Sequence, residues 1–516
     1  MTESIIIIDF GSQVTKLIAR RIREFGVFSQ IVPFNKVTKK LLGKNSVKGI
    51  IFSGGPKSVH EKNSPKIDDY IYELEIPILG ICYGLQLIAK QFGGEIIPSK
   101  DREFGKTKIK LTKKSPLLEN VLFPNKPVQV WMSHSDKISI IPDSFEKIAS
   151  SDNCEFAVIQ DQKKKIYGVQ FHPEVVHTIG GKTILKNFIR NICGCSAKWN
   201  MKFFKKKIIE DIKMLVGKEK VICGLSGGVD STVTAALINS AIGKNLICIF
   251  VDTGLMRENE GKEIKNLFQK NFKIKLKVIK SANNFFSKLK GKSDPEKKRK
   301  IIGKEFIKIF EKFALKQKNV KFLAQGTLYP DVIESLSKVG KTSVTIKSHH
   351  NVGGLPKKMK LKLLEPLSEL FKDEVRLLGK ELNVPEAFLN RHPFPGPGLA
   401  IRLLGCVNEK NIKVLRKADS IFINLIKEEG LYDKIWQAFC VLLPVNTVGV
   451  MGDNRTYEKI CVLRAVTSID GMTAETYKFN DEFIKRCANE IINRVPGINR
   501  VCYDITSKPP GTIEFE

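Results

Sequence analysis

The sequence lacks any apolar run that approaches the ~18 residues needed to cross a bilayer. No basic segment precedes the short isoleucine run at its start, as a secretory signal would require. C-x-x-C pairs are also absent, although the chain holds 11 cysteines. This odd, scattered set argues against a disulfide framework, and Cys193 and Cys195 lack the second pair that a zinc site would need. We therefore expect a cytoplasmic protein that does not contact a membrane.

Acidic residues are scarce relative to basic ones. The chain has 86 Lys and Arg against 54 Asp and Glu, which gives a net charge of 86 − 54 = +32. Such a charge would suit a nucleic-acid-binding protein, but the basic runs are short and spread along the chain, and no pattern of aromatic and basic residues suited to base stacking stands out. Net charge by itself bears on solubility and non-specific binding. We predict no nucleic-acid partner, although a basic surface would attract anionic substrates such as nucleotides.

Two stretches of the chain alternate apolar strands with helical periodicity. Residues 5–8 predict a strand that a helix follows, and residues 221–225 and 231–241 repeat this order after a polar, basic connector at 195–207. Such alternation predicts parallel sheets covered by helices on both faces. A Pro/Gly cluster at 392–398 marks a further boundary. At roughly 150 residues per domain, the 516 residues fit an α/β chain with two doubly wound parallel-sheet domains followed by a smaller α+β domain.

A cysteine stands where a strand turns sharply into a helix, in the string Gly80-Ile81-Cys82-Tyr83-Gly84. The flanking glycines remove the steric obstacle to such a turn, as in the nucleophile elbows that carry serine. The start of the helix favours a thiolate over a thiol. A free cysteine is more often a buried structural residue, so the elbow alone does not settle the role of Cys82.

Two more residues favour a catalytic role for Cys82. His172 and Glu174 are two positions apart, and the intervening proline keeps this stretch extended, so both side chains can point the same way. With Cys82 they supply a nucleophile, a base and a group that orients the base. The backbone at Gly54-Gly55 and the N–H of Tyr83 are candidates for an oxyanion hole.

With these motifs the chain resembles the class I glutamine amidotransferase family over about its first 197 residues. The resemblance implies that glutamine is hydrolysed through a thioester on Cys82 and that ammonia is released. It also implies that His172 is the general base and that Glu174 orients it. The positions at which the family holds glutamine are Gln86, Ser133, His134 and Asp136.

A second site is indicated by the string Ser226-Gly227-Gly228-Val229-Asp230-Ser231, between a predicted strand and a predicted helix. Glycines there let backbone N–H groups approach phosphate oxygens, and a helix N-terminus favours anions. The loop lacks the lysine of a Walker A motif. It resembles instead the S-G-G-x-D-S loop of the ATP pyrophosphatase family, which cleaves ATP between the α and β phosphates. The implied ATP-binding residues are Ser226, Gly227, Gly228, Val229, Asp230, Ser231, Thr232, Val251, Gly326 and Lys372.

Asp230 is the predicted metal ligand, because the Mg²⁺ that accompanies ATP prefers carboxylate oxygen. Asp331 and Glu334 are three positions apart and would share one face of a helix. They either help to bind metal or form an ordinary solvated face, and the sequence leaves both interpretations open.

From Ile5 to Glu516 the chain also resembles a family of glutamine-dependent ligases that aminate xanthosine monophosphate (XMP). The resemblance implies that ATP adenylylates the C2 oxygen of XMP, that pyrophosphate leaves with Lys372 neutralising phosphate charge, and that ammonia then displaces AMP to give GMP. It implies three domains: 1–197 for glutamine hydrolysis, 198–391 for ATP cleavage, and 392–516 for dimerisation and substrate binding. A homodimer is therefore expected. The residues that would hold XMP are Arg299, Gln437, Lys508, Ile513 and Glu514.

Three alternatives accompany this interpretation. Arg299 lies in a basic run and would be an ordinary solvated residue if it does not bind XMP. ATP pyrophosphatase loops also occur in tRNA-modifying enzymes, but those usually carry catalytic cysteines beside the loop, whereas Cys223 and Cys248 lie inside apolar strands. The third alternative is that the chain is another ATP-dependent amidotransferase, such as an NAD synthetase. The loop with His349 and His350 lacks metal-ligand spacing and is expected to close over the substrate site.

Overall fold

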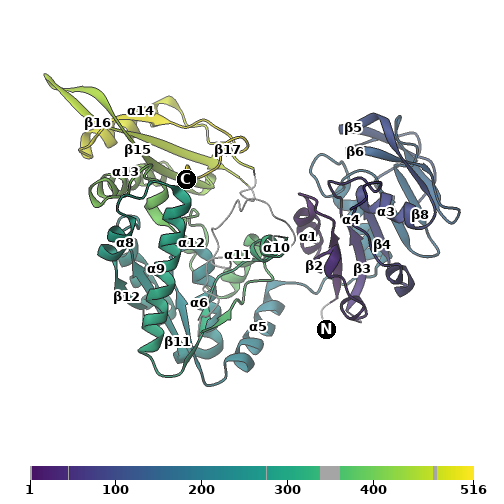
Figure 1. Ribbon diagram of the computed structural model, residues 1–516, viewed down its shortest axis with the longest axis horizontal. Helices are drawn as coiled ribbons and strands as arrows, with labels where there is room; N and C mark the ends of the chain where they lie inside the picture. Colours follow the sequence, from purple (N-terminus) through teal and green to yellow (C-terminus); the bar gives the residue numbers. More distant parts are fainter. Residues whose placement is uncertain (1–2, 45, 275, 338–360, 469–472) are drawn as a thin grey trace. The chain divides into compact units, whose positions relative to one another are not determined.

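The computed structural model describes residues 3–44, 46–274, 276–337, 361–468 and 473–516. The chain divides into two compact units, Met1–Phe204 and Lys205–Glu516 (Figure 1). Among the described residues, no helix combines the length and the apolar character needed to cross a membrane. The predicted loop with His349 and His350 lies outside the described residues.

The first unit contains a sheet with the strand order β2-β1-β3-β4-β9-β8-β7-β5-β6. Strand β1, next to the edge strand β2, is apolar and buried, and it pairs in parallel with β2 and β3. The strand predicted at 5–8 is therefore confirmed. Its strands are β1 (Ser4–Asp9), β2 (Phe28–Pro33), β3 (Val47–Phe52), β4 (Ile78–Ile81), β5 (Glu95–Leu111), β6 (Val128–Ile140), β7 (Glu146–Ser150), β8 (Val158–Asp161) and β9 (Ile166–Val169).

The parallel part of this sheet runs from β2 to β9, and the strands beyond β9 pair antiparallel. The sequence predicted the parallel part and not the antiparallel extension, because β5 and β6 alternate polar and apolar residues without an intervening helix. The helices of this unit are α1 (Thr15–Glu24), η1 (Phe34–Lys36), α2 (Lys39–Leu42), η2 (Asp69–Leu74), α3 (Tyr83–Gln91), η3 (Pro116–Leu118), α4 (Gly181–Asn187) and η4 (Phe188–Ile192).

The second unit begins with a parallel sheet in the order β12-β11-β10-β13-β14. This order places the carboxyl ends of β10, β11 and β13 at one edge, where α/β sheets bind ligands. The strands are β10 (Lys220–Gly224), β11 (Leu246–Asp252), β12 (Leu276–Lys280), β13 (Val320–Ala324) and β14 (Lys362–Leu364). The helices around it are α5 (Met201–Val216), α6 (Val229–Ile242), η5 (Gly243–Asn245), α7 (Glu260–Phe272), α8 (Ala282–Leu289), α9 (Pro295–Leu315), α10 (Tyr329–Ser337), α11 (Lys372–Glu381) and α12 (Glu386–Leu389).

Helix α5 begins inside the polar, basic connector predicted at 195–207, where the sequence pattern indicated no helix. Its apolar residues Met201, Phe204 and Ile212 recur at helical spacing and are buried. The lysines between them hid this periodicity in the sequence, because they lie on the opposite, solvated face.

The last region is the predicted α+β part of the chain. Strands β15 and β16 form a long antiparallel hairpin that projects as an arm (Figure 1), and β18 pairs in parallel with β16. The elements are η7 (Gly398–Ile401), α13 (Glu409–Glu428), η8 (Tyr432–Lys434), β15 (Gln437–Met451), β16 (Asn454–Thr467), β17 (Glu475–Thr476), α14 (Asp481–Arg494) and β18 (Ile498–Tyr503).

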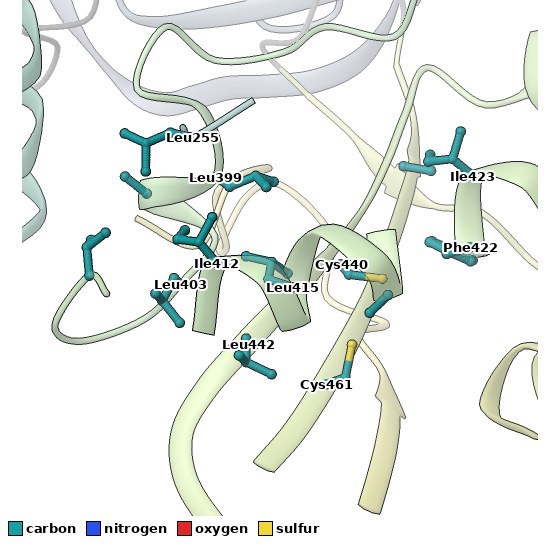
Figure 2. Packing of buried hydrophobic residues seen from close by; sticks show 14 of the residues in the cluster. Leu255, Leu399, Leu403, Ile412, Leu415, Phe422, Ile423, Cys440, Leu442 and Cys461 are labelled. Atoms are coloured by element: carbon teal, nitrogen blue, oxygen red, sulfur yellow. The ribbon is translucent and has the colours of Figure 1, made fainter. Parts of the chain in front are cut away.

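One hydrophobic core joins this last region to the parallel sheet. Leu399 and Leu403 follow the Pro/Gly cluster directly and are almost completely buried. They lie among Leu255, Ile412 and Leu415, as Figure 2 shows. Each leucine buried in this way contributes about 2 kcal/mol. The core is therefore continuous across residue 391, and the domain boundaries at 197 and 391 stay predictions.

Candidate active sites

Cys82 lies at a strained turn between β4 and α3. Its backbone has φ +52° and ψ −106°, a conformation that costs a non-glycine residue about 1–3 kcal/mol. The glycines on both sides are required sterically: a Cβ on Gly80 would lie 2.7 Å from the Gly84 carbonyl carbon, and one on Gly84 would lie 2.5 Å from the Phe52 carbonyl oxygen. The elbow predicted from the sequence is confirmed, and the strain falls on the predicted nucleophile.

The predicted triad is assembled in the structure. His172 Nδ1 lies 2.7 Å from Glu174 Oε1, and the Cys82 side chain interacts with the same imidazole. Glu174 is completely buried, and Cys82 is 6% exposed. Backbone bonds fix this arrangement: the Cys82 N–H donates to Val169 O at 2.8 Å, and the His172 N–H donates to Trp131 O at 2.9 Å.

His172 is held as an imidazolium at neutral pH. Burial alone would lower its pKa, but the Glu174 carboxylate and the hydrogen bonds to Cys82 and Glu174 outweigh burial and raise the pKa of His172 to about 11. The ring therefore carries the proton that a leaving ammonia molecule needs before glutamine arrives.

We expect Glu174→Gln to move the alkaline fall in glutaminase rate to lower pH. The carboxylate raises the pKa of His172, so removing its charge should bring that fall down by about 1–3 pH units. The measurement is glutamate release between pH 7 and pH 11, within the range in which the protein stays folded. Glu155→Gln, which removes an exposed partner of Lys147, serves as the control. An unchanged alkaline fall in Glu174→Gln would show that His172 does not set it.

The predicted oxyanion residues line the same turn. A Cβ on Gly54 would lie 3.1 Å from His172 Cε1, so a larger residue would press on the imidazole. Gly55 lies against Phe10 and Tyr83 in the same way. The Tyr83 hydroxyl donates to Pro65 O at 2.6 Å. The N–H of Tyr83 is the first of α3, and an N–H at that position has no acceptor within its own helix.

The residues predicted to hold glutamine adjoin Cys82. Ser133 O lies 3.6 Å from Cys82 Sγ, and Gln86 Nε2 donates to Asp136 O at 2.9 Å. The His134 side chain, in contrast, is buried and faces Glu103, which sequence reasoning missed. No local signal identifies Glu103, because its strand partner lies 31 residues away.

Glu103, His134 and Cys154 form a buried cluster behind this segment. Their ligand atoms all lie within 4.8 Å of one another, a spacing that could accommodate a metal ion. Burial and the neighbouring Glu103 raise the pKa of Cys154 to about 12, so its thiol is neutral. The two Glu103 oxygens and both ring nitrogens of His134 already have hydrogen-bond partners. The cluster is therefore a satisfied polar network as it stands.

In the second unit the predicted phosphate loop connects β10 to α6. The loop is braced by its own side chains: the Gly228 N–H donates to Ser226 Oγ at 3.3 Å, and Thr232 Oγ1 donates to Gly228 O at 2.8 Å. Gly227 has φ +78°, and a Cβ there would lie 2.7 Å from Arg391 Nη1. Arg391 donates to Gly227 O at 3.0 Å. It is a loop contact that the motif itself did not indicate.

Asp230, Lys372 and Gly326 converge at the start of α6. Lys372 Nζ lies 2.6 and 2.5 Å from the two Asp230 carboxylate oxygens. A Cβ on Gly326 would lie 3.1 Å from Asp230 Cβ. Val251 is near the end of β11, at the same edge of the sheet. Asp331 Oδ2 accepts from the Leu328 N–H at 3.0 Å, and the Glu334 side chain lies outside the described residues, so both interpretations of that pair stay open.

Several residues predicted to hold XMP take part in hydrogen bonds with the last residues of the chain. Glu514 accepts from Arg402 Nε and Nη2 at 3.0 and 2.8 Å, and from Gln437 Nε2 at 2.6 Å. Arg299 and the buried Lys298 both donate to Glu516.

Known proteins resemble this chain over its whole length. The chain matches the glutamine amidotransferase class-I family over residues 6–192, the NAD synthase family over 201–312 and the GMP synthase C terminal domain over 424–515. Over 517 residues it is 55% identical to the GMP synthase [glutamine-hydrolyzing] of Zymomonas mobilis, covering 100% of this chain and 98% of that protein. The chain belongs to the glutamine-hydrolysing GMP synthase family. Relatives of the same name from Bartonella henselae and Bradyrhizobium diazoefficiens are 53% and 54% identical, over 99% and 93% of their lengths.

Within this GMP synthase fold, the structure brings together most of the predicted XMP residues. Ile513 is buried against Phe439 and Val441, next to Glu514. Lys508 is anchored through its backbone, which exchanges hydrogen bonds with Ala474. Sequence reasoning missed Lys298 and Arg402, which hold the last residues of the chain. Both are completely buried cations, and only the fold reveals that.

Proposed function

We propose that this chain makes GMP from XMP, ATP and glutamine. The observation that carries the proposal is that one chain holds both an assembled Cys82-His172-Glu174 triad and a phosphate-binding loop beside Asp230 and Lys372. The triad supplies ammonia, and the loop activates an acceptor for it. Its relatives named GMP synthase, aligned over the whole chain, support XMP as that acceptor.

In the first unit, the Cys82 thiolate attacks the side-chain carbonyl carbon of glutamine. The negative charge that develops on the carbonyl oxygen faces the N–H of Tyr83 and the Gly54-Gly55 backbone. The C–N bond breaks as His172 gives its proton to the leaving nitrogen, which departs as ammonia. Water then attacks the thioester carbon and gives a proton to His172. The C–S bond breaks, which releases glutamate and regenerates the Cys82 thiolate.

In the second unit, the C2 oxygen of XMP attacks the α-phosphorus of ATP, and pyrophosphate leaves. Lys372 is placed to neutralise the departing phosphate charge, for which its ammonium must turn from Asp230 to the nucleotide. The adenylylated oxygen is then a good leaving group. Ammonia attacks C2, the C–O bond breaks, and GMP and AMP are formed.

A magnesium ion bound with ATP fits the chemistry of this loop. The Asp230 carboxylate offers hard oxygen ligands beside the phosphate site. The positive charge of the Lys372 ammonium now pairs with this carboxylate, where the positive charge of a metal ion would also be favourable. Such an ion would neutralise phosphate charge.

We further propose that the protein is cytoplasmic and forms a homodimer. The homodimer is supported by apolar residues exposed on the β15–β16 arm, namely Val448, Val450 and Tyr457. Sedimentation of the purified protein at several concentrations tests the dimer.

The deciding assay is XMP-dependent release of AMP from ATP. We expect release with either glutamine or ammonium as the nitrogen source, one GMP per AMP, and no effect of added RNA. AMP release that requires RNA would support a tRNA-modifying enzyme instead. Release that requires the NAD precursor with a free carboxylate would support an NAD synthetase.

We expect Asp230→Asn to lower ATP-dependent GMP formation by about a hundredfold or more, while basal glutamine hydrolysis stays measurable. The change removes the carboxylate charge at the phosphate loop, and the triad lies in the other unit. AMP release and glutamate release are measured on the same preparation. Asp211→Asn on α5, a residue outside the loop, is the control. If Asp230→Asn turns over XMP normally, Asp230 is not a metal ligand.

A further inference from the structure

A buried carboxyl group lies behind the segment that lines the glutamine site. Glu103 on β5 stands directly opposite His134 on β6 in the antiparallel register. Their side chains are only 4% and 2% exposed, and His134 Nε2 lies 3.1 Å from Glu103 Oε2. The register slips just before this pair, where the four residues between Pro98 and Glu103 lie opposite a single residue of β6, Ser135. This bulge brings Glu103 into line with His134.

His134 connects Glu103 to the glutamine site through further hydrogen bonds. Its Nδ1 lies 3.0 Å from Asp136 O, and the same carbonyl oxygen accepts from Gln86 Nε2. Gln86 Nε2 also lies 3.3 Å from Gln170 Oε1, and Gln170 Nε2 donates to Cys82 Sγ at 3.6 Å. A continuous set of hydrogen bonds therefore runs from Glu103 to the nucleophile.

The two ring nitrogens of His134 constrain the proton count. A carbonyl oxygen only accepts, so Nδ1 must carry a hydrogen to bond Asp136 O. Nε2 faces a carboxylate oxygen, which needs a proton between the two atoms. The Asp136 carbonyl thereby fixes the hydrogen on Nδ1, and Glu103 is the partner of Nε2. Its second oxygen accepts from Ser151 Oγ at 2.9 Å, so the carboxylate is itself held in place.

We propose that Glu103 is a positioning residue for glutamine: through His134 it holds the Ser133–Asp136 segment and the Gln86 amide in the geometry that binds the substrate. This rests on the proposed glutaminase activity. Glu103 does not touch glutamine, so its loss should weaken substrate binding and leave both the Cys82 thiol and the ATP site intact. The second unit should keep its activity with added ammonium.

The test compares Glu103→Ala with the isosteric Glu103→Gln. An alanine leaves His134 Nε2 without a partner, so kcat/KM for glutamine should fall about tenfold or more, mainly through KM. A glutamine amide can donate to a neutral His134 that keeps its hydrogen on Nδ1, so Glu103→Gln should stay within about threefold of the parent. The matched control is Glu146→Ala on β7, which removes a carboxylate bonded to Lys113. It should change neither kcat nor KM for glutamine.

Two further readouts separate positioning from a general folding role. Labelling of Cys82 by a diazoketone analogue of glutamine should slow in Glu103→Ala, while labelling by iodoacetamide and GMP formation from ammonium should stay unchanged. Unchanged glutamine kinetics in a folded Glu103→Ala protein would overturn the proposal. An equal loss of all activities, or a Glu103→Gln protein as defective as Glu103→Ala, would overturn it too. A parent enzyme without glutaminase activity would instead overturn the proposed function.

Discussion

Cys82→Ala is expected to abolish GMP formation from glutamine, by about 10⁴-fold or more, and to keep GMP formation from added ammonium. Alanine has no nucleophile, so the thioester cannot form. The phosphate loop lies in the other unit and is untouched. Because Cys82 is buried and the change removes one sulfur atom, the cost in stability should be about 1 kcal/mol.

The assay measures AMP release with glutamine and then with ammonium chloride at several pH values. Ammonia is mostly protonated at neutral pH, so the rescued reaction should become faster as pH rises, within the range in which the fold survives. Cys195→Ala, another buried cysteine of the first unit, is the control and should keep glutamine-dependent activity. Full glutamine activity in Cys82→Ala would show that Cys82 is only structural. Loss of both activities in a folded protein would show that the two sites are not separable.

Deleting residues 508–516 is expected to abolish GMP formation. The deleted segment contains Glu514 and Glu516, the carboxylate partners of two completely buried cations, Arg402 and Lys298. A buried charge left without its partner costs about 3–5 kcal/mol, so the substrate end of the second unit should lose its order as well as its predicted XMP contacts. Glutamine hydrolysis in the first unit should continue. Undisturbed XMP affinity in a folded, truncated protein would contradict this.

A point variant separates the loss of contacts from the loss of order. Glu514→Gln keeps the size of the side chain and one acceptor oxygen for Arg402 but removes the charge. We expect KM for XMP to rise about tenfold or more, with a fall in melting temperature smaller than that of the deletion. Glu482→Gln, an exposed carboxylate on α14, is the control. A normal KM for XMP in Glu514→Gln would mean that this carboxylate takes no part in binding.

The catalytic motifs of both sites could be predicted from the sequence because each is local. The elbow around Cys82 needs glycines within two residues, and the structure places those glycines where a Cβ would clash. The phosphate loop likewise lies within six consecutive residues, between a strand and a helix that the apolar pattern predicts. His172 and Glu174 are two positions apart, so their relation is also set by neighbouring backbone.

Other features depend on contacts that the sequence does not encode locally. The antiparallel half of the first sheet, the helix at 201–216 and the core that crosses residue 391 were each decided by packing between distant segments. The alternating polarity of β5 and β6 did not specify their register, which a bulge before Glu103 fixes.

The sequence by itself therefore determined the two chemistries, the α/β class and the order of the sites along the chain. The tertiary structure alone decided which groups support them: Glu103 behind His134, Arg391 on the phosphate loop, and Arg402 on Glu514. The physical reason is the range of the interactions. A turn or a helix start is stabilised by residues a few positions apart, whereas Arg402 and Glu514 are 112 positions apart and meet only after the core between them has formed.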